Sequence, residues 1–329
     1  MSKSKKTSSQ AYMEKLQKQI AKDLEEKNFG SLEEANRYIQ ENYIGKEISF
    51  DSKDQKPSNT EKAMDLIYEA WESDDTDEMI SLAEKAIKLD ENCADAYNLL
   101  AEVKAKSPME SLELYAKGIE AGKKSLGNDF EKFKGHFWGF HETRPFMRAM
   151  AGYSDVLWVL GEKSKAIEIM KEMLLLNPND NQGVRHSLIT RLLILNRLLE
   201  AEKLYEDYKD DFSAEWHYSK AYLYFNKRSK QLYADKTLKE AMEYNPYVPL
   251  YLFGLIDMPD ELPDYVGVGD ENEAVSYVDE AMELWANNKK ALMWFVNRHK
   301  KMKNELDRLI EKREKEYGER FGDRFDEDK

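Results

Sequence analysis

The chain has few of the residues that interrupt helices or cross-link a fold. Its 329 residues include 8 Pro, 15 Gly and a single cysteine, Cys93. One cysteine cannot form an internal disulfide and supplies no CxxC pair for zinc or redox chemistry, so we expect a reducing, cytoplasmic location. With 41% hydrophobic and 35% charged residues, this composition excludes collagen-like and globally disordered chains and favours helices.

Long apolar runs are also missing. The longest, such as residues 291–296, reach only about a third of the roughly 20 residues that cross a bilayer. The basic first residues, 1–7, are not followed by an apolar stretch, so we expect no secretory signal. The sequence therefore predicts no transmembrane span and no membrane partner.

An excess of positive charge is absent as well. The chain has 64 acidic against 50 basic residues, a formal charge of -14, which would repel a phosphate backbone and argues against nucleic acid as a partner. Residues 1–22 are the exception, because they hold six Lys against Glu14 alone. A regulatory adaptor that docks nucleic-acid machinery through this basic segment is therefore a weaker alternative.

Two amphipathic helices are predicted near the N-terminus. In the first, apolar side chains recur every fourth residue at Tyr12, Leu16, Ile20 and Leu24. Ser31 followed by Glu34 is a capping box for the second. Turn formers collect between about Gly45 and Thr60. Residues 1–60 are therefore expected to comprise a mobile tail, two helices and a linker.

From Glu61 the pattern changes to pairs of helices that recur at a fixed period. Equivalent positions in the second helices are Ala86, Gly118, Met173, Tyr208 and Ala241. Their spacings are 32, 55, 35 and 33, and three of these lie near 34, the period of the tetratricopeptide repeat. Small residues fit the helix crossings at Ala166, Ala201 and Ala234. The sequence predicts an all-α, tetratricopeptide-like, right-handed superhelical solenoid of helical hairpins over residues 61–255.

Two irregular stretches interrupt or follow this array. The 55-residue spacing exceeds the period by about 21, which places an insertion at about residues 123–144. The second stretch follows Pro246 and lasts to about Asn272. A helix over residues 273–285, capped by Asp270, and a charged helix over about 288–317 then complete the third region, residues 256–329. We expect this region to form a C-terminal helical cap that ends in a frayed tail from residue 319.

Four sequence strings carry a resemblance to a known group. They are GHFWGFHETRPFMRA (135–149), LNPNDNQGVR (176–185), NPYVPLYLFG (245–254) and PDELPDYVGVGDENEAVSY (259–277). They resemble the bacterial tetratricopeptide proteins placed in the family named for suppression of tumorigenicity 7, over about residues 60–296. The resemblance implies a repeat scaffold, and repeat proteins of this kind serve as surfaces for binding partners.

The insertion is rich in polar and aromatic side chains that could bind a ligand or a partner. The candidates are His136, Trp138, His141, Glu142 and Arg144. An arginine can fork onto a carboxylate or phosphate and an indole offers a stacking face. The structural alternative is that Phe137 and Trp138 anchor the insertion while Glu142 pairs with Arg144 or Arg148. His136 and His141 are five residues apart, so they do not have the spacing of a helical zinc pair, and no metal is predicted.

A second polar group follows the third repeat. Asn181, Gln182 and Arg185 stand at the start of a helix and could complete a pocket with the insertion. The alternative is that Asn179, Asp180 or Asn181 only caps that helix. No nucleophile elbow, phosphate-binding loop or dinucleotide fingerprint occurs in the sequence, so no catalytic residue and no cofactor is predicted.

These patterns predict a protein that binds another protein or a peptide in the concave groove of a helical array, without catalysis. The alternative is a small-ligand sensor or enzyme whose pocket is formed by His136, His141, Glu142 and Arg144 with the helix that starts near residue 181.

Overall fold

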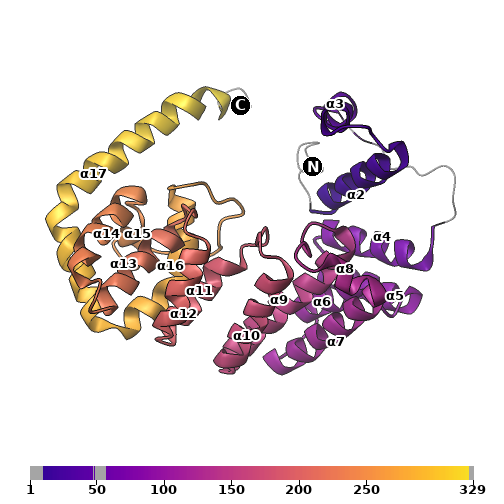
Figure 1. The fold of residues 1–329 in the computed structure, drawn as a ribbon, viewed down its shortest axis with the longest axis horizontal. Coiled ribbons are helices and arrows are strands. Elements are labelled where there is room, and N and C mark those ends of the chain that lie inside the picture. Colours follow the sequence, from indigo (N-terminus) through magenta and orange to yellow (C-terminus); the bar gives the residue numbers. More distant parts are fainter. Residues whose placement is uncertain (1–9, 47, 49–56, 326–329) are drawn as a thin grey trace. The chain divides into compact units, whose positions relative to one another are not determined.

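The computed structural model describes residues 10–46, 48 and 57–325 (Figure 1). Every regular element in these ranges is a helix, and they contain no strand, which confirms the all-α prediction. The helices form two compact units that divide between Gln182 and Gly183. Within the described ranges, no helix combines the length and the apolar character needed to span a membrane.

The first unit contains three consecutive helix pairs. The two helices of each pair pack together, and the first helices of adjacent pairs are also neighbours. The pairs are α4 and α5 (Asn59–Glu72 and Thr76–Leu89), α6 and α7 (Ala94–Val103 and Pro108–Leu126), and α9 and α10 (Arg144–Val159 and Lys163–Leu176). We call the surface formed by α4, α6 and α9 the first-helix face.

Local capping explains where these helices begin. Ser58 accepts a hydrogen bond from the Glu61 amide, and the Glu61 carboxylate accepts one from the Ser58 amide, so α4 starts with a complete capping box. Ser107 accepts from the Glu110 amide, and Pro108 occupies the first turn of α7, where no amide hydrogen is needed. Caps of this kind contribute about 1 kcal/mol each.

Small residues allow the helices to approach closely. Ala166 and Ala201 have no exposed surface and Ala234 is 2% exposed, which confirms their predicted burial. On α9, a Cβ atom added at Gly152 would lie 2.2 Å from the ring of Tyr115 on α7. The ring therefore occupies the space that any other residue at position 152 would need.

Two helices precede the first pair. They are α2 (Gln10–Lys27) and α3 (Leu32–Asn42), and α2 packs on α4. Ser31 accepts from the Glu34 amide at 3.2 Å, so Ser31 caps α3 as predicted, but the Glu34 carboxylate accepts from the Gly30 amide at 3.1 Å, so the second half of the predicted capping box is wrong. The predicted tail over residues 1–9 and most of the predicted linker, residues 47 and 49–56, lie outside the described residues.

The insertion between α7 and α9 is made of short elements. They are η1 (Gly127–Asp129), α8 (Phe130–Phe133) and η2 (His141–Thr143). Because α7 continues through Leu126, the irregular part begins a few residues later than the predicted boundary at 123.

Aromatic packing and backbone hydrogen bonds fix this insertion. Phe137 has no exposed surface, and its ring centre lies 4.9 Å from that of Phe130 and 5.8 Å from that of Phe146. The amides of Gly135 and Phe137 donate to the Leu176 carbonyl at the end of α10, at 2.8 and 3.2 Å. Phe137 therefore anchors the insertion, as the structural alternative expected.

The second unit continues the pairing and adds a covering helix. Its paired helices are α11 (Val184–Ile194) and α12 (Leu198–Asp207), then α13 (Ala214–Asn226) and α14 (Gln231–Tyr244). They are followed by the short α15 (Val248–Leu252), α16 (Glu271–Asn287) and α17 (Lys289–Phe325). α16 packs on both α11 and α13, the first helices of their pairs.

The ends of these last helices test the prediction for the C-terminal region. The Asp270 carboxylate accepts from the Glu273 amide at 2.8 Å, which confirms the predicted cap of α16. α17 continues to Phe325, so the prediction of a frayed tail is wrong for residues 319–325. Residues 311–316, just before this stretch, are all Lys, Arg or Glu, which favour helix, and pairs such as Lys312 with Glu316 at 3.5 Å stabilise these turns.

Candidate functional site

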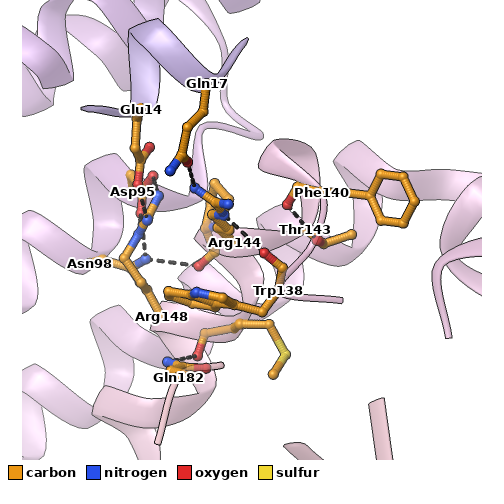
Figure 2. A network of polar contacts seen from close by, with 12 residues as sticks. Glu14, Gln17, Asp95, Asn98, Trp138, Phe140, Thr143, Arg144, Arg148 and Gln182 are labelled. Carbon is orange, nitrogen blue, oxygen red and sulfur yellow. Dashed lines mark hydrogen bonds and ion pairs between the residues drawn. The ribbon is translucent and has the colours of Figure 1, made fainter. Parts of the chain in front are cut away.

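α2 lies on the first-helix face of the first unit. It packs on α4 and contacts α9 through two side chains, Glu14 and Gln17 (Figure 2). Glu14 is 8% exposed, and Ala11, one turn earlier, has no exposed surface. The Lys15 ammonium lies 5.0 Å from the centre of the Tyr68 ring on α4. A helix from outside the repeated pairs thus covers part of this face.

Arg148 on α9 is the centre of the polar contacts under α2. Its Nε and Nη2 donate to the two carboxylate oxygens of Asp95 at 2.8 and 2.5 Å, and its Nη1 donates to Glu14 Oε1 at 2.6 Å (Figure 2). Its guanidinium carbon lies 5.2 Å from the centre of the Trp71 ring. Burial alone would lower the pKa of Arg148, but the charges and hydrogen bonds of Asp95 and Glu14 outweigh burial and raise it. The guanidinium therefore stays charged.

This geometry is suited to binding a carboxylate from another helix. Asp95 has no exposed surface and holds one edge of the Arg148 guanidinium in a bidentate pair. The remaining terminal nitrogen is directed at α2. Because the guanidinium is planar and one edge is fixed, the position of an incoming carboxylate is fixed as well.

Arg144, one turn before Arg148, provides the second polar contact to α2. Its Nε donates to the Trp138 carbonyl at 3.0 Å and its Nη1 donates to Gln17 Oε1 at 2.6 Å. Its guanidinium carbon lies 5.7 Å from the centre of the Trp138 ring, and burial lowers the pKa of Arg144. Two predicted site residues, Trp138 and Arg144, are thus in contact, and Arg144 also binds α2.

Asn98 ties this polar layer together. Its Nδ2 donates to Asp95 Oδ1 and to the Pro145 carbonyl, both at 3.0 Å. Asp95 and Asn98 belong to α6, whereas Pro145 belongs to α9. The amide therefore holds the Asp95 carboxylate in place and links two helices of the first-helix face.

The other predicted residues of the insertion are less engaged. His136 and Glu142 are exposed, and His141 is half-buried with a pKa that burial lowers. The carboxylates that contact Arg148 are Asp95 and Glu14, where the sequence suggested Glu142. In the part of the chain that the structure describes, no group of three or more His, Cys, Asp or Glu side chains is placed to hold a metal ion.

The predicted residues after the third pair are divided between the units. In the first unit, Asn181 is exposed and Gln182 Nε2 donates to the Met147 carbonyl at 3.5 Å. Arg185 belongs to the second unit, where its Nε donates to Asp211 Oδ2 at 2.6 Å. Arg185 is therefore part of a cluster within the second unit.

That cluster is built around a single carboxylate. His186 Nε2 lies 2.9 Å from Asp211 Oδ2, and the Ser213 amide donates to Asp211 Oδ1 at 2.8 Å. Burial alone would raise the pKa of Asp211, but its hydrogen bonds with His186 and Ser213 outweigh burial and lower it. These contacts join the start of α11 to the segment that precedes α13.

A cavity of about 140 Å³ lies in the first unit next to α2. Its lining residues are Glu14, Lys18, Thr60, Met64, Tyr68, Asn92, Cys93, Ala94, Gly122, Ser125, His141, Glu142 and Pro145. Cys93 is 5% exposed, and burial raises the pKa of its thiol to about 12. The thiol is therefore protonated near neutral pH, which argues against its use as a nucleophile.

The sequence did not reveal the central group of this site. Its pattern suggests Arg148 only as a partner of Glu142 and gives Asp95, Glu14 and Gln17 no role in the site. One signal was available, because Arg148 follows Arg144 by four residues and therefore shares its helix face. The positions of Glu14 and Asp95 depend on tertiary packing and have no local signature.

Comparisons with known proteins find distant relatives. The chain is 22% identical over 262 residues to the Suppressor of tumorigenicity 7 protein-like of Rattus norvegicus, a match that covers 72% of this chain and 45% of that protein. The corresponding protein of Homo sapiens is 23% identical over 264 residues, covering 72% of this chain and 44% of that protein. The chain thus spans about half the length of the curated relatives it matches. No family model and no solved structure matches the chain.

Proposed function

We propose that this chain is a tetratricopeptide-like scaffold that binds another protein without catalysis. In this proposal, the first-helix face of the first unit receives an amphipathic helix of the partner. A carboxylate of that helix pairs with Arg148, and a side-chain acceptor one turn later pairs with Arg144.

The position of α2 is the observation that supports the proposal most. An amphipathic helix already lies on this face, with Glu14 paired to Arg148 and Gln17 to Arg144. The face is thus compatible in shape and charge with a helical ligand of this type.

The residue types on the face also favour recognition of a protein. Arginine and tryptophan are enriched among residues that dominate binding energy at protein interfaces, and here Arg148 lies against Trp71 and Arg144 against Trp138. The net charge of -14 does not oppose an acidic partner at this point, because two guanidinium groups are gathered locally.

The test uses the chain's own helix as a model ligand. A fluorescent peptide of residues 10–27 is titrated into the full chain carrying Glu14→Arg. In this variant the positive charge at position 14 repels Arg148, so the chain's own α2 no longer occupies the face. We expect saturable binding by fluorescence anisotropy, and a loss of at least tenfold in affinity when Arg148→Ala is added. Arg228→Ala, at an exposed arginine of the second unit, is the matched control and should bind as well as its parent. Equal binding with and without Arg148 would reject this face as the site.

A further inference from the structure

α2 contributes few buried side chains to its contact with the first-helix face. Among the residues of α2 whose exposure is described, Ala11 and Glu14 are the buried ones, and the apolar Leu16 and Ile20 are half-buried. Glu14 and Gln17 of α2 accept hydrogen bonds from Arg148 and Arg144 on α9. Another helix that offers a carboxylate and an amide oxygen at these two places can replace both bonds one for one.

The α2–α3 hairpin also has internal contacts of its own. The hydroxyls of Tyr38 and Tyr43 both donate to Asp23 Oδ2, at 2.6 and 2.7 Å, and Gln19 Nε2 donates to Asp23 Oδ1 at 2.8 Å. The rings of Phe29 and Tyr38 lie 5.2 Å apart. These contacts lie within residues 10–43 and do not involve the repeated pairs, so they can persist when α2 leaves the face.

The connection to the repeats is long enough to permit this departure. Fourteen residues, 44–57, separate Tyr43, which the hairpin holds through Asp23, from Ser58, which caps α4. At about 3.3–3.6 Å per extended residue, a segment of this length can span on the order of 50 Å. α3 contributes no buried residue that would hold the hairpin in place.

Part of the organisation of this face does not involve α2. The bidentate pair of Arg148 with Asp95 and the bond of Arg144 to the Trp138 carbonyl are made without any atom of α2. Once α2 has left the face, one nitrogen of each guanidinium would be open to a ligand. The two arginines are four residues apart on α9, and the two groups they bind are three residues apart on α2.

From these observations we infer that α2 is a built-in competitor that a partner helix must displace from the first-helix face. The partner helix carries the pattern seen in α2: a small residue, a carboxylate three residues later, and an amide or carboxylate oxygen three residues after that. This inference rests on the proposed function and adds to it the class of ligand and the means by which access is limited.

The attachment of α2 to the same chain sets how much it should weaken the binding of an outside helix. Because α2 and the helix pairs belong to one chain, docking of α2 is intramolecular, with an effective concentration on the order of 1 mM. If the helix alone bound with a dissociation constant of about 100 µM, α2 would be docked about nine-tenths of the time. An outside helix would then bind the native chain about tenfold more weakly than a chain whose α2 is released.

Cys93 offers a direct readout of this release in the full chain. It is the only cysteine in the sequence, it is 5% exposed, and it lines the cavity that Glu14 and Lys18 of α2 help to enclose. The rate at which a maleimide modifies Cys93 should therefore rise when α2 departs. The affinity for the residue 10–27 peptide is measured on the same proteins.

Three full-length proteins are compared: the native chain, Glu14→Arg, and the matched control Glu26→Arg. Glu26 is on the same helix, and its side chain is 64% exposed in a pair with Lys22. We expect Glu14→Arg to bind the peptide about tenfold more tightly than the native chain and to react with maleimide at least several-fold faster. Glu26→Arg should match the native chain in both measurements.

The outcomes separate this inference from the proposed function. If the native chain and Glu14→Arg both bind the peptide through Arg148 with the same affinity, α2 is no competitor, although the face is still a binding site. If Glu14→Arg reacts faster at Cys93 but does not bind the peptide, α2 is displaceable and the proposed function fails. If Glu14→Arg neither binds more tightly nor reacts faster, the inference is overturned.

Discussion

Each unit has a helix that covers the first helices of its pairs, and the two covering helices differ in kind. α16 in the second unit contributes a continuous set of buried residues: Glu273, Ala274, Val275, Tyr277, Val278, Ala281, Leu284 and Trp285. α2 in the first unit contributes Ala11 and Glu14 among the residues whose exposure is described. Burying one large apolar side chain stabilises by about 1.5–3 kcal/mol, so α16 is part of the core whereas α2 is held by a few polar bonds.

The chemistry under each helix shows the same contrast. The Trp285 indole donates to the Tyr277 hydroxyl at 2.8 Å, and the Tyr277 ring stacks on Tyr218 of α13 at 5.2 Å. Under α2, the main contact is a guanidinium between two carboxylates. A face covered by apolar packing is closed to ligands, whereas a face covered by exchangeable polar bonds can be opened by a ligand that offers the same bonds.

The largest predicted effect is at the core of α16. Trp285→Ala should lower the free energy of unfolding of the second unit by about 3–5 kcal/mol, because it removes a fully buried side chain and leaves a cavity. Urea denaturation followed by circular dichroism measures this loss. Leu16→Ala, at a half-buried position of α2, is the comparison and should cost less than about 1.5 kcal/mol. Similar losses for the two variants would remove the distinction between the covering helices.

Arg148→Ala should have the next largest effect. It leaves the fully buried Asp95 carboxylate without its ionic partner, and removing one member of a buried pair costs about 3 kcal/mol or more. The first unit should therefore unfold at a lower urea concentration. Arg148→Ala combined with Asp95→Ala should recover part of the stability, since no buried charge is then uncompensated. A double variant less stable than Arg148→Ala would contradict this account of the site.

An intermediate effect is expected at Asp211 in the second unit. Its pKa is lower in the folded chain than in the unfolded chain, so its contribution to stability is present above the unfolded pKa of about 4 and is lost as pH falls through the folded pKa. Asp211→Asn should therefore be less stable than the native chain at about pH 5, and the difference should shrink toward about pH 3. A difference that stays constant between them would exclude the proposed role of this charge.

Local features of the fold could be predicted from the sequence because they depend on near neighbours. Ser31 and Asp270 cap their helices as predicted, and Ala166 is buried as predicted. These features follow from hydrogen bonds and spacings within a few residues. The prediction for the end of α17 is wrong, because the charged residues from 319 on suggested a frayed tail but the helix continues to Phe325.

The candidate site was only partly predictable, because its central contacts join distant segments. Glu14 and Arg148 are 134 residues apart, and no pattern near either residue indicates the pair. The sequence assigned Tyr12 and Leu16 to the apolar stripe of α2, yet these side chains are half-buried while the polar Glu14 is buried. The sequence pattern does not predict that Glu14 is buried, because burying a carboxylate is favourable only when a partner such as Arg148 is in place.

A smaller predicted change in stability is the one that most directly tests whether α2 is exchangeable. Glu14→Ala removes one hydrogen bond from Arg148 but leaves the bidentate pair with Asp95, so no buried charge is orphaned. We expect the first unit to lose about 1.5–3 kcal/mol of unfolding free energy, the range for a hydrogen bond to a charged group, which is less than Arg148→Ala should cost. Maleimide should nevertheless modify Cys93 several-fold faster, because the thiol lies beside the cavity that α2 helps to close. A large loss of stability with no change in Cys93 reactivity would instead make α2 a fixed part of the core, as α16 is.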